Sequence, residues 1–416
     1  MVKVAVLGGS GIATPELVDA LVRRLDLKQP LELVLVGRSP GKLAKVASLC
    51  ASLARPRPQL TISQSTDFES ALADARYVIN QIRVGGLQAR AFDETFPHAF
   101  DLPGEETVGP GGFANALRTI PVVLGYARLI EEVAPEATLL TFANPSSLVQ
   151  YAITRHTAVN TIGLCDSPVT MIRGIAGLLG APVAELSVEY AGMHHFGWVT
   201  GLRWRGQDVL QQVLQRAHQI LNLGIEAELV KALGAIPHFY LKYFFHRERM
   251  LTQQRGKPAR ARQLMALQEE ILAAYDGEPT DKPAALSKRG ARWYESVIVP
   301  VLVALVENRS ERHIVNVQNG TTLPWLPPEA IIETPAVLEE GWGRPLPPHS
   351  VPDAVRALIQ HNCAYEMLAV EAIVEQSYTK ALRALVLNPM GITYDQAKGI
   401  LKRIWPTGMP QESEGE

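Results

Sequence analysis

Cys165 and His195 are the residues of this chain whose types and surroundings first indicate chemistry. Cys165 ends an apolar segment, and His195 lies in the run Gly-Met-His-His-Phe-Gly. A thiolate and an imidazole suit a divalent transition metal, and oxygen atoms of a substrate can complete its coordination. A cysteine after a buried strand is more often a core residue, and a single histidine is more often structural. Taken alone, the pair is therefore only a weak indication of a metal site.

Asp166 follows Cys165 directly and adds a carboxyl group at the same place. At the carboxyl end of a parallel strand, such a side chain faces the crevice in which ligands bind. A carboxyl group there could act as a general acid. The run Asp166-Ser167-Pro168 also has the pattern of a helix start that is capped by the aspartate. The two roles are compatible, and the sequence leaves both open.

A glycine-rich turn near the start of the chain indicates a nucleotide site. It follows an apolar strand expected at residues 2–7 and precedes a helix that Thr14 is expected to cap. Such a turn places backbone N–H groups and a helix N-terminus where a pyrophosphate can bind. Ser10 and Ala13 replace two glycines of the G-x-G-x-x-G pattern, and both are small. The residues expected to bind the dinucleotide are Gly8, Gly9, Ser10, Gly11 and Ile12.

The end of the second expected strand, residues 31–36, bears on which dinucleotide binds. Enzymes that use NAD usually carry an acidic residue there, which holds the ribose diol. This chain has Gly37, Arg38 and Ser39 at that place and no carboxylate. Arg38 could accept the 2′-phosphate of NADP, or it could be a solvated loop residue. The sequence therefore predicts NAD as the cofactor with NADP as an open alternative.

The pattern of apolar segments predicts an α/β protein with two domains. Strands are expected at residues 2–7, 31–36, 77–82, 138–142 and 161–164, with helices such as 16–25 and 124–133 between them. Continuous apolar strands between helices indicate a parallel, doubly covered sheet, here a Rossmann-type domain at residues 1–167. Residues 168–416 are expected to form a mainly helical α+β substrate domain, with a strand at 186–189, helices at 209–223, 262–275 and 355–385, and a disordered tail from Pro406.

Composition narrows the classes of function. The net charge of −2 over 416 residues argues against a nucleic-acid-binding protein. No apolar segment is long enough to span a bilayer, and no signal peptide is recognisable. The three cysteines are far apart and form no C-x-x-C pattern. We therefore expect a cytoplasmic protein that acts on a small soluble substrate.

The ordered set of short motifs resembles glycoside hydrolase family 4 over nearly the whole chain. The resemblance rests on segments at residues 14–17, 83–87, 104–118, 144–145, 163–166, 191–195, 240–243, 288–290 and 313–316. This family is an exception to the two-carboxylate mechanism of glycosidases. It implies that a bound dinucleotide oxidises the sugar at C3, that a base removes the C2 proton, and that the aglycone leaves by elimination. Water then adds, and the stored hydride returns to C3.

The same resemblance assigns roles to residues. It makes Cys165 and His195 the ligands of a divalent metal, usually Mn²⁺, which would bind the C2 and C3 oxygens of the sugar. Tyr240 falls where the family keeps its base, and Asp166 where a leaving-group acid can stand. Asn144 matches a residue that contacts substrate hydroxyls beside the cofactor. The family also implies a homodimer or homotetramer.

Departures from the family pattern leave the substrate open. The segment at 83–87 resembles 6-phospho-β-glucosidases, whereas Asp166 resembles 6-phospho-α-glucosidases. His194 replaces the usual Asn before the metal histidine, so a contact to substrate or metal is expected to differ. A 6-phospho-β-glucoside is the first expectation, another anionic glycoside the second, and an NAD(P)-dependent 2-hydroxy-acid dehydrogenase the third. The candidates for binding an anionic group are Arg83, Arg90, Arg260, Arg262 and Arg289.

Overall fold

The first half of the chain forms a parallel sheet whose strand order is that of a Rossmann domain. In this computed structural model, which describes residues 1–220, 222–276 and 280–409, the strands follow the order β3-β2-β1-β4-β5-β6. Their bounds are β1 Val2–Leu7, β2 Leu31–Val36, β3 Leu60–Ser65, β4 Tyr77–Asn80, β5 Thr138–Thr141 and β6 Asn160–Gly163. The order reverses between β1 and β4, and such a switch point is where α/β sheets bind ligands.

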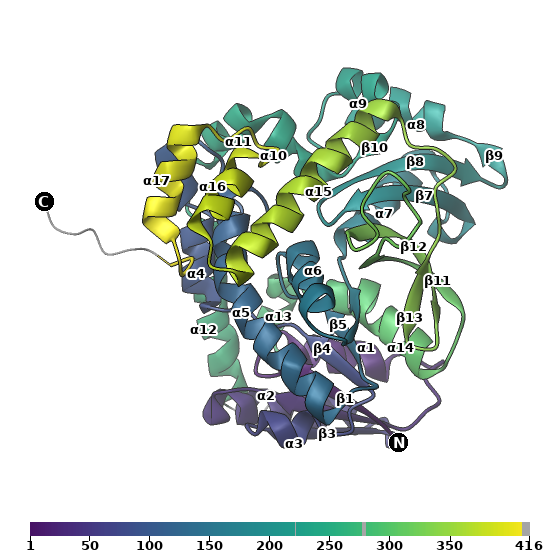
Figure 1. The fold of residues 1–416 in the computed structure, drawn as a ribbon. Helices are drawn as coiled ribbons and strands as arrows, with labels where there is room; N and C mark the ends of the chain where they lie inside the picture. Colours follow the sequence, from purple (N-terminus) through teal and green to yellow (C-terminus); the bar gives the residue numbers. More distant parts are fainter. Residues whose placement is uncertain (221, 277–279, 410–416) are drawn as a thin grey trace, which may run out of the picture.

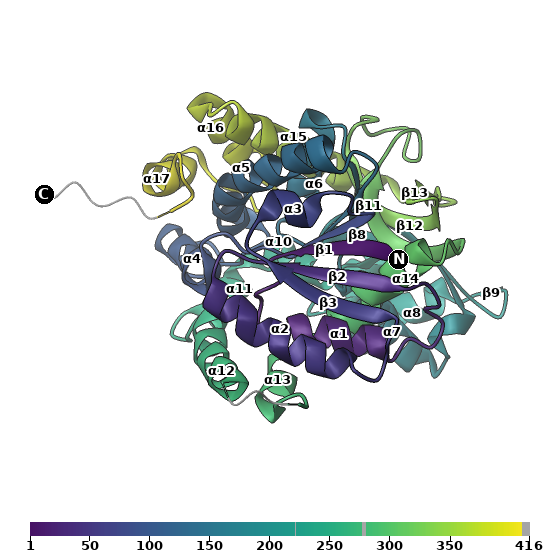
Figure 2. The same ribbon diagram turned by 90° about the horizontal axis from the view of Figure 1, so that it is seen from below.

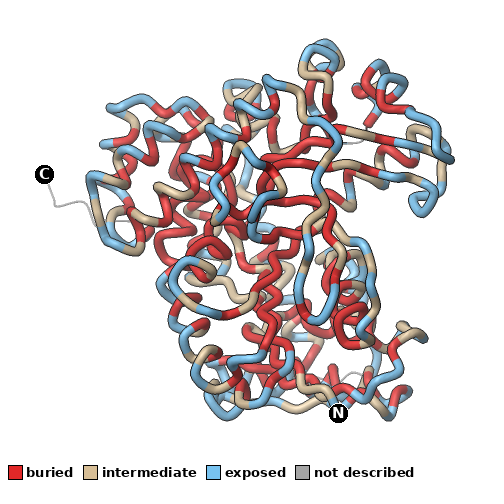
Figure 3. Tube along the Cα trace, turned by 45° about the vertical axis from the view of Figure 1, so that its right-hand side comes forward, coloured by how far each residue is buried: buried red, intermediate tan, exposed pale blue. Residues whose placement is uncertain are grey.

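Helices cover both faces of this sheet (Figures 1 and 2). Helices α1 and α2 pack together on one face, and α3, α5 and α6 lie on the other. Their bounds are α1 Thr14–Val22, α2 Pro40–Ala54, α3 Phe68–Leu72, α4 Gly86–Asp93, α5 Gly109–Val133, α6 Ser146–His156 and α7 Ser167–Leu179. Strands β1, β2, β4, β5 and β6 are largely buried, and Figure 3 shows buried chain running through the middle of the molecule, whereas only Leu60 of the edge strand β3 is buried. This double cover explains why the strands are continuous apolar runs without alternation.

The second half of the chain extends the same sheet with antiparallel strands. Strand β11 pairs with β6, and the order continues through β12, β7, β8 and β10, so the described residues form one sheet of 13 strands. The bounds of these strands are β7 Leu186–Met193, β8 Phe196–Trp204, β9 Gln207–Asp208, β10 Ile236–Pro237, β11 Glu311–Gln318, β12 Ile331–Glu339 and β13 Trp342–Pro345. The sheet continues without a break across the domain boundary expected at residues 167–168, so that boundary stays a prediction. The strands before it pair with one another in parallel, and those after it pair antiparallel.

Helices make up most of the second half, and α12 and α13 contribute Gln268 and Arg289 to the wall of the cavity described below. Their bounds are α8 Leu210–Gln215, α9 Ala227–Leu233, α10 Lys242–Phe245, α11 Arg247–Gln254, α12 Arg260–Tyr275, α13 Ala284–Arg289, α14 Val299–Val306, α15 Asp353–Val374, α16 Tyr378–Val386 and α17 Tyr394–Ile404, with a short π-helix at Tyr294–Ile298. Among the described residues, none of the helices combines the length and the apolar character that a membrane crossing requires. The expected α/β class, with a Rossmann-type half and a largely helical second half, is confirmed.

Some expected elements differ from the structure. The helix expected at 209–223 ends at Gln215, and a short 3-10 turn follows at Ala217–Gln219. The helix expected at 355–385 is broken at Gln376, whose φ of +51° is left-handed, and Ser377 caps a new helix there. Thr14 is the first residue of α1, not its cap. The disordered tail expected from Pro406 lies mostly outside the described residues, but Gly408 accepts a hydrogen bond from Arg118.

Candidate active site

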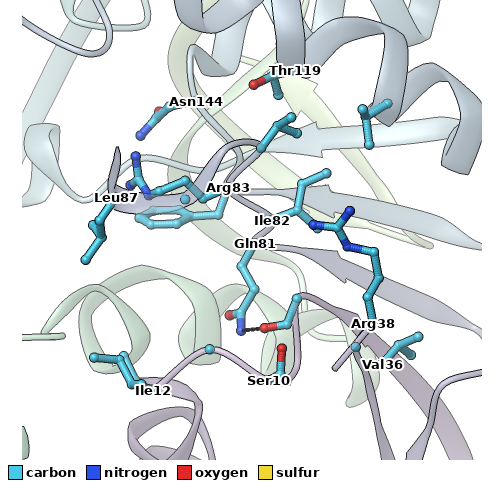
Figure 4. A pocket seen from close by; sticks show the side chains of 18 of the residues that line it. Ser10, Ile12, Val36, Arg38, Gln81, Ile82, Arg83, Leu87, Thr119 and Asn144 are labelled. Atoms are coloured by element: carbon cyan, nitrogen blue, oxygen red, sulfur yellow. Dashed lines mark hydrogen bonds between the residues drawn. The ribbon is translucent and has the colours of Figure 1, made fainter. Parts of the chain in front are cut away.

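A cavity of about 380 Å³ opens at the carboxyl ends of β1 and β4, where the strand order reverses (Figure 4). The glycine turn forms its floor. Gly8 has a φ of +83°, which favours glycine, and a Cβ atom on Gly9 would lie 2.7 Å from the backbone nitrogen of Val36. The turn therefore needs glycine at both positions in order to pack against β2 and stay open to the cavity.

Backbone donors of the turn are available to a ligand. Among the described residues, no group accepts a hydrogen bond from the backbone N–H of Ser10, Ile12 or Ala13. All three residues line the cavity, next to the first turn of α1. Free N–H groups at a helix N-terminus bind phosphate oxygens. The turn therefore fits the pyrophosphate of a dinucleotide, as the sequence predicts.

Gln81 holds the turn in place, and sequence reasoning missed it. Its side-chain amide donates to the carbonyl oxygen of Gly8 at 3.2 Å and to the Thr14 hydroxyl at 3.0 Å. Its own oxygen accepts from the Tyr294 hydroxyl at 2.8 Å, so the second half of the chain closes over the turn. The sequence did contain one signal for Gln81, namely a polar residue directly after the buried strand at residues 77–80.

The charges that face the cavity are all positive. The described residues that line it include no aspartate or glutamate, and its cations are Arg38, Lys42, Arg83 and Arg289. Arg83 is paired with the buried Glu106, which also pairs with Arg90 at 2.8 Å. Arg289 has no ion pair among the described residues. Burial and then the charges of Arg83, Arg90 and Arg260 lower the pKa of Arg289 to about 10. An anion beside Arg289 would relieve this repulsion.

Three of the five expected anion-binding arginines do not line this cavity. Arg260 is exposed and donates to Gln263, although its charge still acts on Arg289. Arg262 is exposed and is not among the residues that line the cavity. Arg90 lies behind the cavity wall and is held by Glu94 and Glu106. The structure thus brings Arg83 and Arg289 to the cavity, together with Asn144. Figure 4 shows Arg83 and Asn144 there.

A cluster of buried side chains that could hold a metal ion lies beside the cavity. The donor atoms of Cys165, His194 and His195 lie within 4.8 Å of one another. His195 has a left-handed φ of +62°, a conformation that costs free energy in a non-glycine residue. Its Nδ1 is 2.9 Å from the Thr107 hydroxyl, which orients the ring, and its Nε2 lies 3.4 Å from the Ser167 hydroxyl. A thiol and two imidazoles suit a divalent transition metal.

Burial keeps this cluster neutral in the protein. It lowers the pKa of His194 to about 3 and holds that of His195 well below its ordinary value, and it raises the pKa of the Cys165 thiol. A neutral imidazole is the form that binds a metal. Among the described residues, no group hydrogen-bonds either ring nitrogen of His194, which is 5% exposed. A buried, unpartnered imidazole beside Cys165 fits a metal ligand better than a packing residue.

Tyr240 stacks on His195 with ring centres 3.8 Å apart and the planes 7° from parallel. The structure therefore places the expected base directly against an expected metal ligand. Burial, followed by the negative charge of Glu105, raises the pKa of Tyr240 well above its ordinary value. The cluster adjoins the cavity through Glu106 and Thr107, because Glu106 pairs with the cavity residue Arg83 and Thr107 contacts His195.

Asp166 does not cap helix α7, although it occupies the capping position. Its carboxyl group makes no hydrogen bond to the first turn of the helix, so the expected capping role is wrong. Burial raises the pKa of Asp166. A raised pKa lets a carboxyl group hold its proton to a higher pH than an exposed aspartate does, and in that form it can act as an acid. The side chain is therefore free for chemistry next to Cys165.

A buried carboxyl group supports the site from behind. Glu333, on β12, is 1% exposed and accepts a hydrogen bond of 2.8 Å from the Tyr190 hydroxyl. The amide of Asn316 donates to its other oxygen at 3.4 Å. Burial raises the pKa of Glu333 to about 8. Its carboxyl group is therefore protonated in the folded protein at neutral pH.

This shift predicts a measurable pH dependence of stability. A folded-state pKa above the unfolded value adds stability that is complete below the unfolded pKa and is lost as pH rises toward the folded pKa. Glu333→Gln is expected to remove this loss. Between about pH 5 and about pH 8, the free energy of unfolding of wild type should therefore fall by up to about 4 kcal/mol relative to that of Glu333→Gln. Urea titrations at the two pH values measure it. Glu339→Gln, at the exposed end of the same strand, is the control, and parallel profiles for wild type and Glu333→Gln would refute the assignment.

Comparison with protein-family models matches nearly the whole chain. A model described as family 4 glycosyl hydrolase matches residues 3–181, and one described as the family 4 glycosyl hydrolase C-terminal domain matches residues 190–391. Together they span the glycine turn, the metal-binding cluster and Arg289.

Individual proteins resemble the chain over the same length. A probable 6-phospho-beta-glucosidase of Bacillus subtilis is 32% identical, over 96% of this chain and 94% of that protein. A maltose-6′-phosphate glucosidase of the same organism is 28% identical over 93% of this chain and 91% of that protein. The structure of a Thermotoga maritima 6-phospho-beta-glucosidase with manganese, NAD⁺ and glucose-6-phosphate superimposes with a TM-score of 0.88 at 27% identity, covering 97% of each chain.

Proposed function

The chain belongs to family 4 of the glycosyl hydrolases, and on that premise we propose that it hydrolyses 6-phosphorylated glucosides, the β-anomers first, with a nicotinamide dinucleotide and a divalent metal. The observation that carries the proposal is the buried set of Cys165, His194 and His195 beside a cavity that has a glycine turn and an unpaired Arg289. Relatives that cleave 6-phospho-β-glucosides and maltose 6′-phosphate support the substrate class.

The chain's own residues suit both cofactors. The N–H groups of Ser10 and Ile12 would hold the pyrophosphate, and Asn144 would face the reacting sugar from the cavity wall. Cys165 and His195 would bind the metal, with His194 as a third donor. When bound, the dinucleotide takes up and returns a hydride, and the metal supplies positive charge that acidifies nearby hydroxyl groups.

Tyr240 is the base in this proposal, and it removes the proton from C2 of the sugar. The surrounding residues raise its pKa, so its hydroxyl loses a proton readily only when a positive charge lies close to it. Its stacking on His195 places it beside the candidate metal ligands. Asp166, with its raised pKa, holds the proton that the leaving oxygen takes up.

Asp166 is also the reason to keep the α-anomer as a second candidate. In the family resemblance an aspartate after the metal cysteine matches the 6-phospho-α-glucosidases, and a maltose-6′-phosphate glucosidase is among the relatives. The test is a panel of chromogenic α- and β-glucosides, each with and without a 6-phosphate, assayed with dinucleotide and Mn²⁺. Preference for a phosphorylated glucoside supports the proposal, and cleavage of unphosphorylated glucosides alone would contradict it.

Arg289 is expected to bind the 6-phosphate of the substrate. Arg289→Ala should raise KM for a phosphorylated glucoside by about 10- to 100-fold with a smaller effect on kcat, because a charge-assisted hydrogen bond is lost. Steady-state kinetics on matched phosphorylated and unphosphorylated glucosides measure it. Lys288→Ala is the control, since Lys288 is exposed and paired with Glu270 at 2.9 Å. An equal loss on both substrates would show that Arg289 does not bind the phosphate.

Location and assembly are further parts of the proposal. Three free, buried cysteines (Cys50, Cys165 and Cys363) are consistent with the reducing cytoplasm. We expect a homodimer or homotetramer, and exposed apolar residues on α16 and α17, among them Tyr378 and Tyr394, are a candidate interface. Light scattering coupled to gel filtration would measure the oligomeric state.

A further inference from the structure

The end of strand β2 forms one wall of the dinucleotide cavity. Gly37 packs against the glycine turn so closely that a Cβ atom there would lie 2.9 Å from the Ser10 hydroxyl. Arg38 follows Gly37 and lines the cavity. In Figure 4, Arg38 lies on the far side of Ile82 from Arg83 and Asn144. The residues after β2 thus face the part of the cavity that is remote from the proposed sugar site.

The residue at this position determines whether a Rossmann domain binds an adenosine ribose with a free 2′-hydroxyl group or one with a 2′-phosphate. An acidic side chain there holds the 2′- and 3′-hydroxyl groups of NAD and repels a 2′-phosphate, whereas an arginine accommodates the phosphate. Here the described residues that line the whole cavity include no carboxylate. The feature that would favour NAD is therefore missing, and nothing in the described lining repels a phosphate.

Two cations take the place of the missing acid. Arg38 and Lys42, one turn into α2, both line the cavity. Among the described residues neither has an ion pair or a side-chain hydrogen bond, whereas Lys45 on the same helix pairs with Asp276. Burial without a compensating acid lowers the pKa of Lys42. Two uncompensated cations at one end of a cavity favour a bound anion.

Aromatic side chains complete this end of the cavity. Phe68 and Tyr126 both line it, and their rings stack with centres 5.1 Å apart and planes 12° from parallel. Such rings offer an apolar surface for a purine base. The pyrophosphate has its own donors in the glycine turn, so Arg38 and Lys42 remain for a second phosphate group near the adenosine.

We infer that Arg38 and Lys42 form a site for the 2′-phosphate of NADP, and that this chain binds NADP⁺ in preference to NAD⁺. The inference rests on the proposed function for the presence of a dinucleotide. Ser39 adds a hydroxyl group beside Arg38 and is a further candidate donor to the phosphate.

Isothermal titration of the full-length protein with NADP⁺ and with NAD⁺ tests the inference without any glycoside. NADP⁺ is expected to bind at least about tenfold more tightly. Arg38→Ala should weaken NADP⁺ binding by about 10- to 100-fold and leave NAD⁺ binding within about twofold. Lys42→Ala should act in the same direction, and Lys45→Ala, one turn further along the helix, is the matched control that should change neither. Thermal melting checks that each variant is folded.

The outcomes separate this inference from the proposed function. Equal affinity for the two dinucleotides, or an equal loss of both in Arg38→Ala, would overturn the 2′-phosphate site while leaving dinucleotide dependence intact. Binding of neither dinucleotide would overturn the inference and the proposed function together. As an independent check, adenosine 2′,5′-bisphosphate should compete for the site better than ADP, and no difference between them would also overturn the inference.

Discussion

Replacing Tyr240 by phenylalanine is expected to lower kcat by about 10²- to 10⁴-fold, the usual contribution of a positioned base. The phenylalanine ring keeps the stack on His195 at 3.8 Å, so the metal cluster should stay intact and only the hydroxyl is lost. Exchange of the C2 proton of the sugar with solvent should disappear, whereas reduction of the bound dinucleotide by substrate should survive. Nuclear magnetic resonance in D₂O and absorbance of the reduced dinucleotide measure the two steps separately.

Tyr243→Phe is the control for this variant. Its ring centre lies 5.9 Å from that of Tyr240, and it removes a neighbouring hydroxyl group without touching the proposed base. It should keep C2 exchange at a rate near that of wild type. Undiminished turnover in Tyr240→Phe, or loss of dinucleotide reduction together with C2 exchange, would show that Tyr240 is not the base.

Cys165→Ser should abolish most of the metal-dependent activity. Cys165 is 4% exposed, and serine is close to it in size, so the fold should survive while a strong ligand becomes a weak one. We expect kcat/KM to fall by about three orders of magnitude, because the positive charge that a metal supplies is worth several kcal/mol. Metal content after dialysis and the Mn²⁺ dependence of turnover measure the effect.

Two further variants make this prediction specific. Cys363→Ser changes another buried cysteine, which donates to the sulfur of Met367 on α15, and should keep metal and activity. His194→Asn restores the residue usual in the family and should weaken metal binding by less than Cys165→Ser does. Full metal content and activity in Cys165→Ser would remove Cys165 from the site.

Much of the parallel half of the fold is predictable from the sequence because local patterns decide it. Strands that are buried on both faces appear as continuous apolar runs, and the expected strands agree with β1, β2, β4, β5 and β6 to within two residues at each end. The broken helices were not predictable from periodicity alone. The apolar spacing continues beyond Gln215, where α8 ends, and it also passes Gln376, where the chain turns. Burial on one face is compatible with both a helix and its interruption, so tertiary packing decides between them.

The candidate site was predictable only where motifs mark it. The resemblance to the family pointed to Cys165, His195 and Tyr240, which the fold brings together from three separate segments. Charge counting could not tell Arg289 from Arg262, because only the fold shows that one lines the cavity and the other is exposed. Lys42 was missed because only the fold shows that it lines the cavity together with Arg38. Side chains whose role depends on long-range packing give no local signal.

The most direct test of the central claim is hydrolysis of a 6-phospho-β-glucoside in D₂O with catalytic amounts of dinucleotide and Mn²⁺. The account predicts a glucose 6-phosphate that carries deuterium at C2, release of the aglycone that requires both cofactors, and no net accumulation of reduced dinucleotide. Product without deuterium at C2 would contradict the elimination mechanism. Steady accumulation of reduced dinucleotide would instead identify a dehydrogenase on the same Rossmann framework.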